Sequence, residues 1–382
     1  METVIRRWYD LINIPSVNGH EIDAANYVAQ ALREMGLDPH YSWFEDDKTR
    51  ERPSVWTVFD TGREGPTMLL IGHIDTVDVN PANWKTDPFK ATEIDGKVYG
   101  RGAMDMKGGD ACLLTTLEHF VKHPENICGR ILACFVADEE GLSKGTYQLV
   151  AENVIKADYA IMAECRYDNV AVGFRGRYSF EVTVKGQAAH ASHYPHVGEN
   201  ALISAGKLAA AIEALPTKQH PKLEGGTWCV RHMEGGNAST LVVPDRCNLF
   251  VDRYVVPGET EESCIAQIKE AATQLGLANK VDVRLKPRKS PYMQSFAVPE
   301  DHVLVTTLQR AFREVDGREL ICAYDPSVCD SNIVAVQLGI PVVTFGPSGG
   351  NMHGDNEWGV PEQVRNCLEI YIRTVGELLA RA

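Results

Sequence analysis

The sequence predicts an α/β protein in which helices flank a mixed, mostly parallel sheet, with an inserted α+β domain of ferredoxin-like order. Nearly continuous apolar runs, such as Thr67–Ile71 and Arg130–Val136, are typical of strands that are covered on both faces. These runs alternate with segments of helical periodicity, which indicates a parallel sheet between helices. Between residues 175 and 286, polar and apolar residues alternate instead, as in a half-exposed antiparallel sheet.

A chain of 382 residues exceeds one ordinary core, so two domains are expected. The α/β domain is expected to be discontinuous, over residues 1–174 and 287–382. Apolar residues at helical spacing predict its helices, and short apolar runs between turn residues predict its strands. The expected helices are 21–35, 108–121, 302–315 and 362–379, and the expected strands are 55–59, 67–71, 130–136, 158–162 and 340–345.

The inserted domain is expected over residues 175–286. Its strands are predicted at 178–184, 228–233, 240–243, 247–256 and 281–285, and its helices at 200–215 and 261–275. The order of the two helices and the four longer strands, β-α-β-β-α-β, is that of a ferredoxin-like domain, in which two helices cover one face of four antiparallel strands.

Composition excludes several classes of function. The formal net charge is −14 and no basic stripe is present to neutralise phosphates, so no nucleic-acid partner is expected. No apolar run approaches the ~18 residues of a membrane span, so no membrane partner is expected either. The start of the chain has no export-signal pattern, and the ten cysteines show no tight pairing. Together these features predict a cytoplasmic protein with reduced thiols.

Ionisable residues follow the predicted buried strands at the points where those strands end. Because the carboxyl ends of parallel strands meet at one edge of a sheet, we expect these side chains to converge. They are His73 and Asp75, Glu139 and Glu140, Glu164, His353 after a Gly-rich loop, and Asp105 ahead of the helix at 108–121.

Two imidazoles and several carboxylates are the ligands of a two-metal site. Asp105 is the natural bridge, since a carboxylate has two oxygens. Glu139 and Glu140 are adjacent in sequence, so one can bind metal while the other acts as a general base on water. Asp75 can orient the imidazole of His73 through its second ring nitrogen.

Each of these residues also has a structural interpretation. An acidic pair such as Glu139-Glu140 is often solvated surface, and Asp105 can stabilise a helix N-terminus. The Gly-rich run at 100–109 fits neither the dinucleotide nor the phosphate-loop pattern, because Asp105 stands where a third glycine is needed.

Taken together, the segments resemble the metallohydrolase family of succinyl-diaminopimelate desuccinylase, acetylornithine deacetylase, aminoacylase-1 and carboxypeptidase G. The resemblance spans nearly the whole chain and implies a zinc-peptidase-like catalytic domain with an inserted lid or dimerisation domain. One departure is Cys165 after Glu164, where the family usually has proline. The matching stretches are 72–76, 99–108, 138–141, 163–164 and 346–357.

The resemblance implies a role for each residue of the predicted site. His73 and Glu164 are implied to bind one zinc, Glu140 and His353 the other, and Asp105 both; cobalt or manganese accept the same ligands. Asp75 is implied to orient His73, and Glu139 to be the base.

The resemblance also assigns residues of the inserted domain. His190 is implied to reach the active site of the partner in a homodimer formed through this domain, where it stabilises the developing oxyanion. Asn237, Arg253 and Arg175 match substrate-side positions, although both arginines have the alternative of a structural salt bridge. His190, His193 and His196 are spaced by three, which alternatively suggests a separate metal cluster.

The function predicted from these residues is hydrolysis of the amide bond of an N-acyl amino acid or small peptide-like substrate. The alternative within the same fold is a metallo-carboxypeptidase or dipeptidase, which differs only in the acyl half of its substrate. A non-catalytic relative that only binds metal or a ligand is a third possibility; loss of Glu139 or of a metal ligand would indicate it, and all are present.

Overall fold

The computed structural model describes residues 2–380, which divide into two compact units. The first unit contains everything up to Val172, the segment Ala297–Ala323 and everything from Cys329 on. The second contains Gly173–Phe296 and the short segment Tyr324–Val328. The second unit is therefore inserted into the first.

The return from the second unit to the first lies later than the expected boundary at 286/287. The segment that follows the last strand of the insert still packs on the second unit. Tyr292 contacts its apolar core, and the backbone N–H of Arg177 donates to the carbonyl of Met293 at 2.8 Å.

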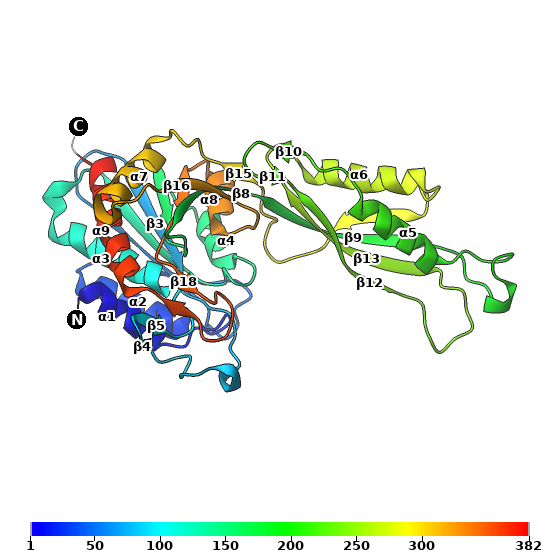
Figure 1. The fold of residues 1–382 in the computed structure, drawn as a ribbon, viewed down its shortest axis with the longest axis horizontal. Helices are drawn as coiled ribbons and strands as arrows, with labels where there is room; N and C mark the ends of the chain where they lie inside the picture. The colour runs from blue at the N-terminus through cyan, green and yellow to red at the C-terminus, as the bar shows by residue number, and fades with distance from the viewer. Residues whose placement is uncertain (1, 381–382) are drawn as a thin grey trace. The chain divides into compact units, whose positions relative to one another are not determined.

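A nine-stranded sheet forms the centre of the first unit, in the order β1-β2-β6-β3-β7-β17-β8-β15 with β16 on β8 (Figure 1). Its middle is parallel, since β3 pairs in parallel with β6 and β7, and β17 with β7. Antiparallel pairs complete it at β1–β2, β2–β6 and β8–β17. The predicted mixed, mostly parallel sheet is confirmed. The strands are β1 (His40–Ser42), β2 (Ser54–Asp60), β3 (Thr67–His73), β6 (Arg130–Val136), β7 (Tyr159–Met162), β8 (Asn169–Phe174), β15 (Phe296–Ala297), β16 (Ile321–Asp325) and β17 (Val342–Thr344).

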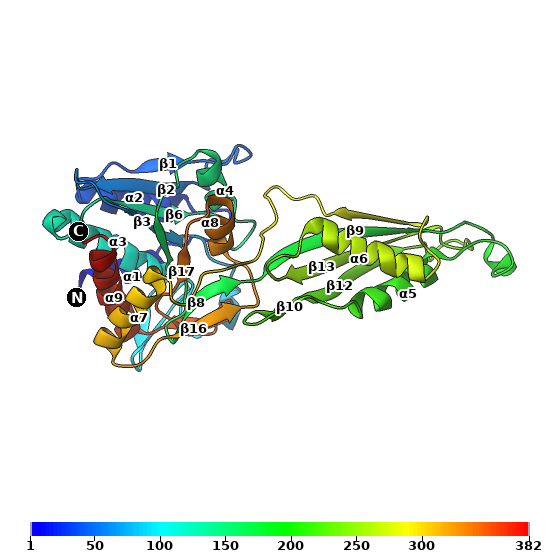
Figure 2. The ribbon, with the colours of Figure 1, turned by 90° about the horizontal axis from the view of Figure 1, so that it is seen from above.

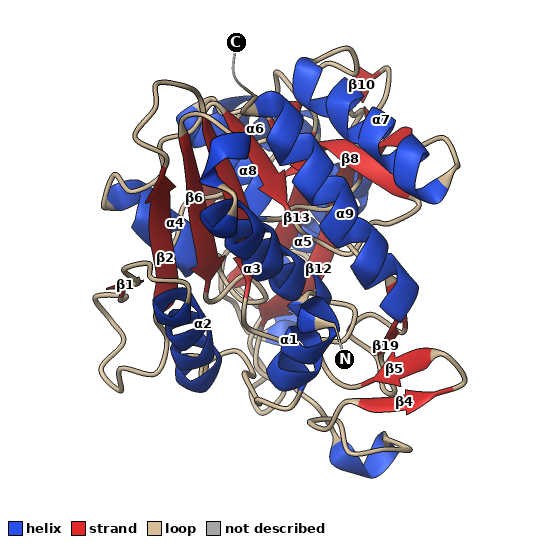
Figure 3. Cartoon of the chain, turned by 90° about the vertical axis from the view of Figure 1, so that its left-hand side faces the viewer, coloured by secondary structure: helices blue, strands red, loops and turns tan. Residues whose placement is uncertain are grey.

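Helices cover both faces of this sheet. On one face α3 packs against α1 and α9, and α7 packs against α9 (Figure 3). On the other face α4 and α8 lie together (Figure 2). The helices are α1 (Thr3–Ile12), α2 (Ile22–Glu34), α3 (Lys107–Lys122), α4 (Lys144–Ala151), α7 (Val303–Asp316), α8 (Asp330–Leu338) and α9 (Pro361–Leu378), with short 3-10 turns at Pro81–Asn83 and Pro124–Asn126.

A small four-stranded sheet and helices α1, α4 and α8 were not predicted. The sheet has the order β18-β19-β5-β4 and consists of β4 (Thr92–Ile94), β5 (Lys97–Tyr99), β18 (Gly349–Gly350) and β19 (Trp358–Gly359). Its strands are two or three residues long, too short to show a periodicity. Pairing of β19 with β5 brings the loop before α3 next to the loop after β18, although the paired residues Tyr99 and Trp358 are 259 positions apart in the chain.

The second unit has the predicted ferredoxin-like order. Its sheet runs β12-β13-β9-β14, with each neighbouring pair antiparallel, and α5 and α6 follow the first and third strands in the chain. The elements are β9 (Gly176–Lys185), a 3-10 turn at Ala191–His193, α5 (Ala201–Glu213), β12 (Thr227–Gly235), β13 (Arg246–Val255), α6 (Glu261–Gln274) and β14 (Val281–Leu285), with a small hairpin of β10 (Gln219–His220) and β11 (Glu224–Gly225).

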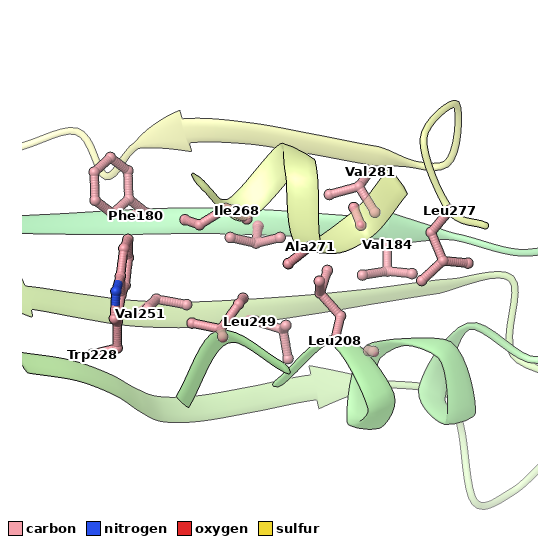
Figure 4. Packing of buried hydrophobic residues seen from close by; sticks show 14 of the residues in the cluster. Phe180, Val184, Leu208, Trp228, Leu249, Val251, Ile268, Ala271, Leu277 and Val281 are labelled. Carbon is pink, nitrogen blue, oxygen red and sulfur yellow. The ribbon is translucent and has the colours of Figure 1, made fainter. Parts of the chain in front are cut away.

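An apolar core lies between the two helices and the sheet of this unit. Phe180 from β9 and Leu249 and Val251 from β13 meet Leu208 of α5 and Ile268 of α6 (Figure 4). All five are fully buried. Alternate residues of β9 and β13 point to this side, which explains the alternation in the sequence.

The strand predicted at 240–243 is wrong. These residues form a loop whose only ladder contact among the described residues is the single bridge between Val242 and His190. Leu241 is 71% exposed, so the apolar run does not mark a buried strand. The following Pro244 lacks a backbone donor, which disfavours continued pairing.

Among the described residues, no disulfide bond joins any of the ten cysteines. Within residues 2–380, no helix combines the length and the apolar character that crossing a membrane requires.

Candidate metal centre

His73 is the last residue of β3, the strand at the centre of the parallel region, and its side chain is buried. Strands β6 and β7 flank β3, so residues that follow them arrive at the same edge of the sheet. Gly72 permits this packing. A Cβ at this position would collide with the carboxylate of Asp110 and the methyl group of Met106, so only glycine lets β3 approach α3 this closely.

Two clusters of ligand atoms meet at this edge and share Asp105. In one, atoms of His73, Asp105 and Glu164 lie within 4.8 Å of one another; in the other, atoms of Asp105, Glu140 and His353 do. Nε2 of His73 lies 3.1 Å from Oδ1 of Asp105, and Nε2 of His353 lies 3.1 Å from Oδ2. Each oxygen of Asp105 therefore faces one cluster, as a bridging carboxylate must.

The remaining contacts complete each cluster. Nε2 of His73 lies 3.4 Å from Oε1 of Glu164, and Nε2 of His353 lies 3.0 Å from Oε1 of Glu140. Three carboxylates thus converge with two imidazoles, and this excess of negative ligand atoms requires cations between them. Imidazole nitrogen and carboxylate oxygen suit zinc, and cobalt and manganese accept the same donors.

The carboxylates raise the pKa of both imidazoles. Burial opposes protonation of His73, but Glu164 and Asp105 outweigh it and its pKa lies well above the usual range. Hydrogen bonds with Asp105 and Glu140 raise the pKa of His353 to about 10. Burial raises the pKa of Glu164 to about 7, and the charge of Asp105 adds to this effect. Metal binding here therefore requires protons to leave the imidazoles.

Glu139 adjoins the centre but belongs to neither ligand cluster. Burial raises the pKa of its carboxyl well above the usual range, and the charge of Glu164 raises it further. A carboxyl group with a raised pKa can both accept and return a proton near neutral pH, which is the property that a general base in amide hydrolysis needs.

Asp75 holds the turn that carries Glu139 and Glu140. Its Oδ1 accepts from the backbone N–H of Glu139 at 3.1 Å, and its Oδ2 from that of Glu140 at 3.0 Å. The ring of His73 donates from Nδ1 to the backbone carbonyl of Asp75 at 2.9 Å, whereas the carboxylate lies 3.6 Å away. The predicted orientation of His73 by Asp75 is thus made mainly through the main chain.

Two residues that the sequence did not indicate support this turn. Asn18 donates to Oδ2 of Asp75 at 2.8 Å, and Arg52 forms ion pairs with Asp138 and Glu21. Asp138 itself has a left-handed backbone with φ of 67° and precedes the acidic pair. Neither Asn18 nor Arg52 lies in a recognisable motif, so only the folded chain reveals their proximity.

The four predicted residues of the insert belong to the second unit, whereas all residues of the ligand clusters belong to the first. His190 is exposed, and its Nδ1 lies 2.8 Å from the hydroxyl of Ser192. Its ring centroid lies 5.8 Å from that of His193. Across residues 2–380, the two clusters at Asp105 are the only groups with metal-binding geometry, so His190, His193 and His196 form no third cluster.

The contacts of Arg253 are those of the structural alternative. Its side chain is fully buried, forms an ion pair with Glu259 and lies 4.7 Å from the centroid of the Trp228 ring. Position 253 faces the apolar core because β13 alternates, so this guanidinium presents no surface to a substrate.

Arg175 and Asn237 occupy different environments. Arg175 donates from Nε and Nη2 to the carbonyl of Leu223, at 3.2 and 3.0 Å. Asn237 is exposed and lines a cavity of about 530 Å³ beside the end of β12. Its amide oxygen accepts from the backbone N–H of Ser239 at 2.8 Å, which fixes the loop.

The fold and the donor set together define a metal-dependent hydrolase that acts on amide or peptide bonds. The chain belongs to peptidase family M20/M25/M40, whose sequence model matches residues 69–377.

Similar proteins agree with this family. A succinyl-diaminopimelate desuccinylase of Nitrosomonas eutropha is 31% identical over 341 residues, which cover 86% of this chain and 87% of the relative. The aminopeptidase PepT of Bacillus cereus has the same fold, with a TM-score of 0.81, 20% identity and coverage of 98% of both chains. The YXEP protein of Bacillus subtilis, a dinuclear metal-binding peptidase of the M20 family, gives a TM-score of 0.74 at 15% identity and covers 98% of this chain and 97% of its own.

Proposed function

We propose that this chain is a di-zinc amidohydrolase that cleaves the acyl group from an N-acyl amino acid, as a succinyl-diaminopimelate desuccinylase does. The observation that carries the proposal is the position of Asp105, whose two oxygens each face one cluster of ligand atoms. The choice of an acyl amino acid rests on the curated relatives of about 30% identity, which are desuccinylases.

Five side chains would hold the metal ions. His73 and Glu164 would bind one zinc, Glu140 and His353 the other, and Asp105 both. When bound, the ions would lower the pKa of water toward neutrality and polarise the carbonyl of the substrate. The same donors would accept cobalt or manganese.

Glu139 is proposed to move the proton. It takes a proton from the attacking water as the water oxygen forms a bond to the acyl carbon. It then gives this proton to the leaving nitrogen as the C–N bond breaks, which yields a carboxylic acid and an amine. The second proton of the water passes from the acid to the amine, so the products are a carboxylate and an ammonium group. Asp75 serves this step indirectly, because its carboxylate holds the backbone of Glu139 and Glu140.

We further propose a homodimer formed through the inserted unit, in which His190 stabilises the oxyanion at the partner's site. Strand β12 is an edge of its sheet and can pair with a second copy. Exposed apolar side chains near this edge support the proposal, since Met233 on β12 is 46% exposed and Ile203 on α5 is 52% exposed. Asn237 is proposed to contact the substrate, and the location is proposed to be cytoplasmic.

The test is a substrate screen with zinc-loaded and cobalt-loaded protein. N-succinyl-diaminopimelate, N-acetylornithine, other N-acyl amino acids and dipeptides would be compared by detecting the released amine. Preferred release from N-acyl amino acids supports the proposal. Cleavage of dipeptides alone, or of a C-terminal residue from a peptide, would establish the peptidase alternative instead, and no hydrolysis of any amide would overturn both.

Subunit mixing tests the shared site. His190→Ala and Glu139→Gln are each expected to be nearly inactive as homodimers. Mixed dimers contain one site with both Glu139 and His190, so part of the activity returns. His196→Ala serves as the matched control and is expected to keep its activity. Verified heterodimers without regained activity would exclude the shared site.

A further inference from the structure

Glu357 is a fully buried carboxylate, 1% exposed, beside the metal centre but in neither ligand cluster. It lies directly before β19, in the same connection that carries His353 after β18. The sequence places it within a matching stretch but gives it no role.

The Glu357 carboxylate accepts hydrogen bonds from four donors of the loop that ends at Asp105. Oε1 accepts from the backbone N–H groups of Met104 at 2.8 Å and Asp105 at 3.0 Å. Oε2 accepts from the backbone N–H of Gly102 at 3.1 Å and from Nη1 of Arg101 at 2.7 Å. A carboxylate has about four acceptor sites, so all of them are used here.

The main chain adds to this attachment. The carbonyl of Glu357 accepts from the N–H of Gly100 at 3.1 Å, and β19 pairs with β5 immediately before that residue. The loop that carries Asp105 is thus bound at five of its residues to the connection that carries His353, namely at Gly100, Arg101, Gly102, Met104 and Asp105.

Arg101 extends the contact toward the second imidazole. Its guanidinium is 2% exposed, and its Nη2 donates to the carbonyls of Asp78 at 3.2 Å and His353 at 3.5 Å. Its face lies 5.3 Å from the centroid of the Trp84 ring. The Glu357–Arg101 pair therefore touches the backbone of both Asp105 and His353, two ligands of the same cluster.

We propose that Glu357 is a positioning residue that sets the placement of Asp105 between the two metal sites and holds the Asp105–Glu140–His353 site together. This inference rests on the proposed di-metal function. Without the carboxylate, three backbone N–H groups lose their acceptor and the buried guanidinium of Arg101 loses its ion-pair partner, which is costly enough to shift the loop from this conformation. His73 stands on strand β3, so its cluster loses only the contact to Asp105.

The test uses Glu357→Gln, which keeps the size of the side chain and removes the charge. Outer partners of metal ligands typically contribute about 10- to 100-fold to metal affinity. We expect the zinc site at Asp105, Glu140 and His353 to lose affinity by about this factor, which competition with a chelator measures. After dialysis, elemental analysis is expected to fall from two metals per chain toward one. The absorption spectrum of the cobalt-loaded protein is expected to change as well.

Two further variants separate positioning from general damage to the fold. Glu362→Gln, on the exposed first turn of α9, is the matched control and is expected to bind metal as the parent does. Arg101→Gln leaves the carboxylate on the N–H groups of Met104 and Asp105, so it is expected to weaken metal binding less than Glu357→Gln. Should Glu357→Gln fail to fold, the double variant Arg101→Gln/Glu357→Gln removes the unpaired buried charge, and weak binding at one site is expected to persist.

A folded Glu357→Gln or double variant that binds two zinc ions with parental affinity would overturn the inference. These readouts do not require turnover. Failure of the parent protein to hydrolyse any amide would count against the proposed function. The inference on metal placement would still be decided by metal affinity and metal content.

Discussion

Both units bury an apolar core, but they differ in the setting of the charged side chains that they bury. At the carboxyl edge of its sheet, the first unit buries His73, Asp75 and Asp105 around a centre that requires cations. The second unit buries an apolar cluster, and its fully buried arginine, Arg253, is paired with Glu259. Buried charge at the metal centre is therefore placed for chemistry, whereas around Arg253 it is neutralised for stability. Changes at the metal centre should mainly alter activity, and changes in the core of the second unit should mainly alter folding.

Removal of metal is expected to have the largest effect. Chelation should abolish hydrolysis, because the proposed reaction depends on the metal ions to lower the pKa of the attacking water and to polarise the substrate carbonyl. Stoichiometric zinc should restore it. Bound metal should also raise the unfolding temperature of the first unit, since an ion that binds only the folded state stabilises it by mass action. If elemental analysis shows that the protein lacks metal and its activity still equals that of the parent, the buried charges at Asp105 do not serve metal-dependent hydrolysis.

Glu139→Gln is expected to have the next largest effect, a loss of turnover of about 10² to 10⁴-fold. The variant should retain two metals, because Glu139 belongs to neither ligand cluster. Its stability should not fall, since burial already disfavours the charged form of this carboxyl by raising its pKa. Steady-state kinetics, elemental analysis and thermal unfolding provide the measurements.

The exposed Glu125→Gln is the control for this variant and should leave all three quantities unchanged. A Glu139→Gln protein that holds both metals and hydrolyses substrate at the parental rate would remove Glu139 as the base.

The sequence predicts the metal-ligand residues at the carboxyl edge of the first unit's sheet well, because most of them stand at or directly after the ends of buried strands. His73, Glu140 and Glu164 follow β3, β6 and β7, and strand pairing alone brings them together. The sequence does not show the hydrogen bonds that hold these ligands in place. Glu357 reaches Asp105 across 252 residues of chain, through a sheet whose strands are too short to leave a pattern.

The same contrast applies to the second unit. Its strand alternation predicts the ferredoxin-like order, but the side of β13 that an arginine faces depends on register. Arg253 lies opposite Trp228 on the neighbouring strand and therefore points into the core. A motif position alone favours substrate and structural roles equally, and only the pairing register decides between them.

Phe180→Ala tests the stability side of the comparison. Truncating a fully buried phenylalanine is expected to cost about 3–5 kcal/mol in the free energy of unfolding, because it leaves a cavity in the cluster of the second unit. Metal content should stay at the parental value. Val197→Ala, at a position 51% exposed, is the control and should change stability by less than about 0.5 kcal/mol. Loss of metal in folded Phe180→Ala would show that the two units are not independent in this respect.

The smallest effect is expected from replacing both members of the buried pair, in Arg253→Met/Glu259→Met. Arg253→Met alone leaves the Glu259 carboxylate buried without its cation and should cost about 3–5 kcal/mol in the free energy of unfolding. Replacing both partners removes the two desolvated charges together, so the double variant should come close to the parent in denaturant unfolding. If Arg253 acts only within the core, KM should also be unchanged in the double variant. A stable double variant with a strongly raised KM and unaltered kcat would instead assign Arg253 to the substrate, and the second unit would then bury charge for chemistry as the first does.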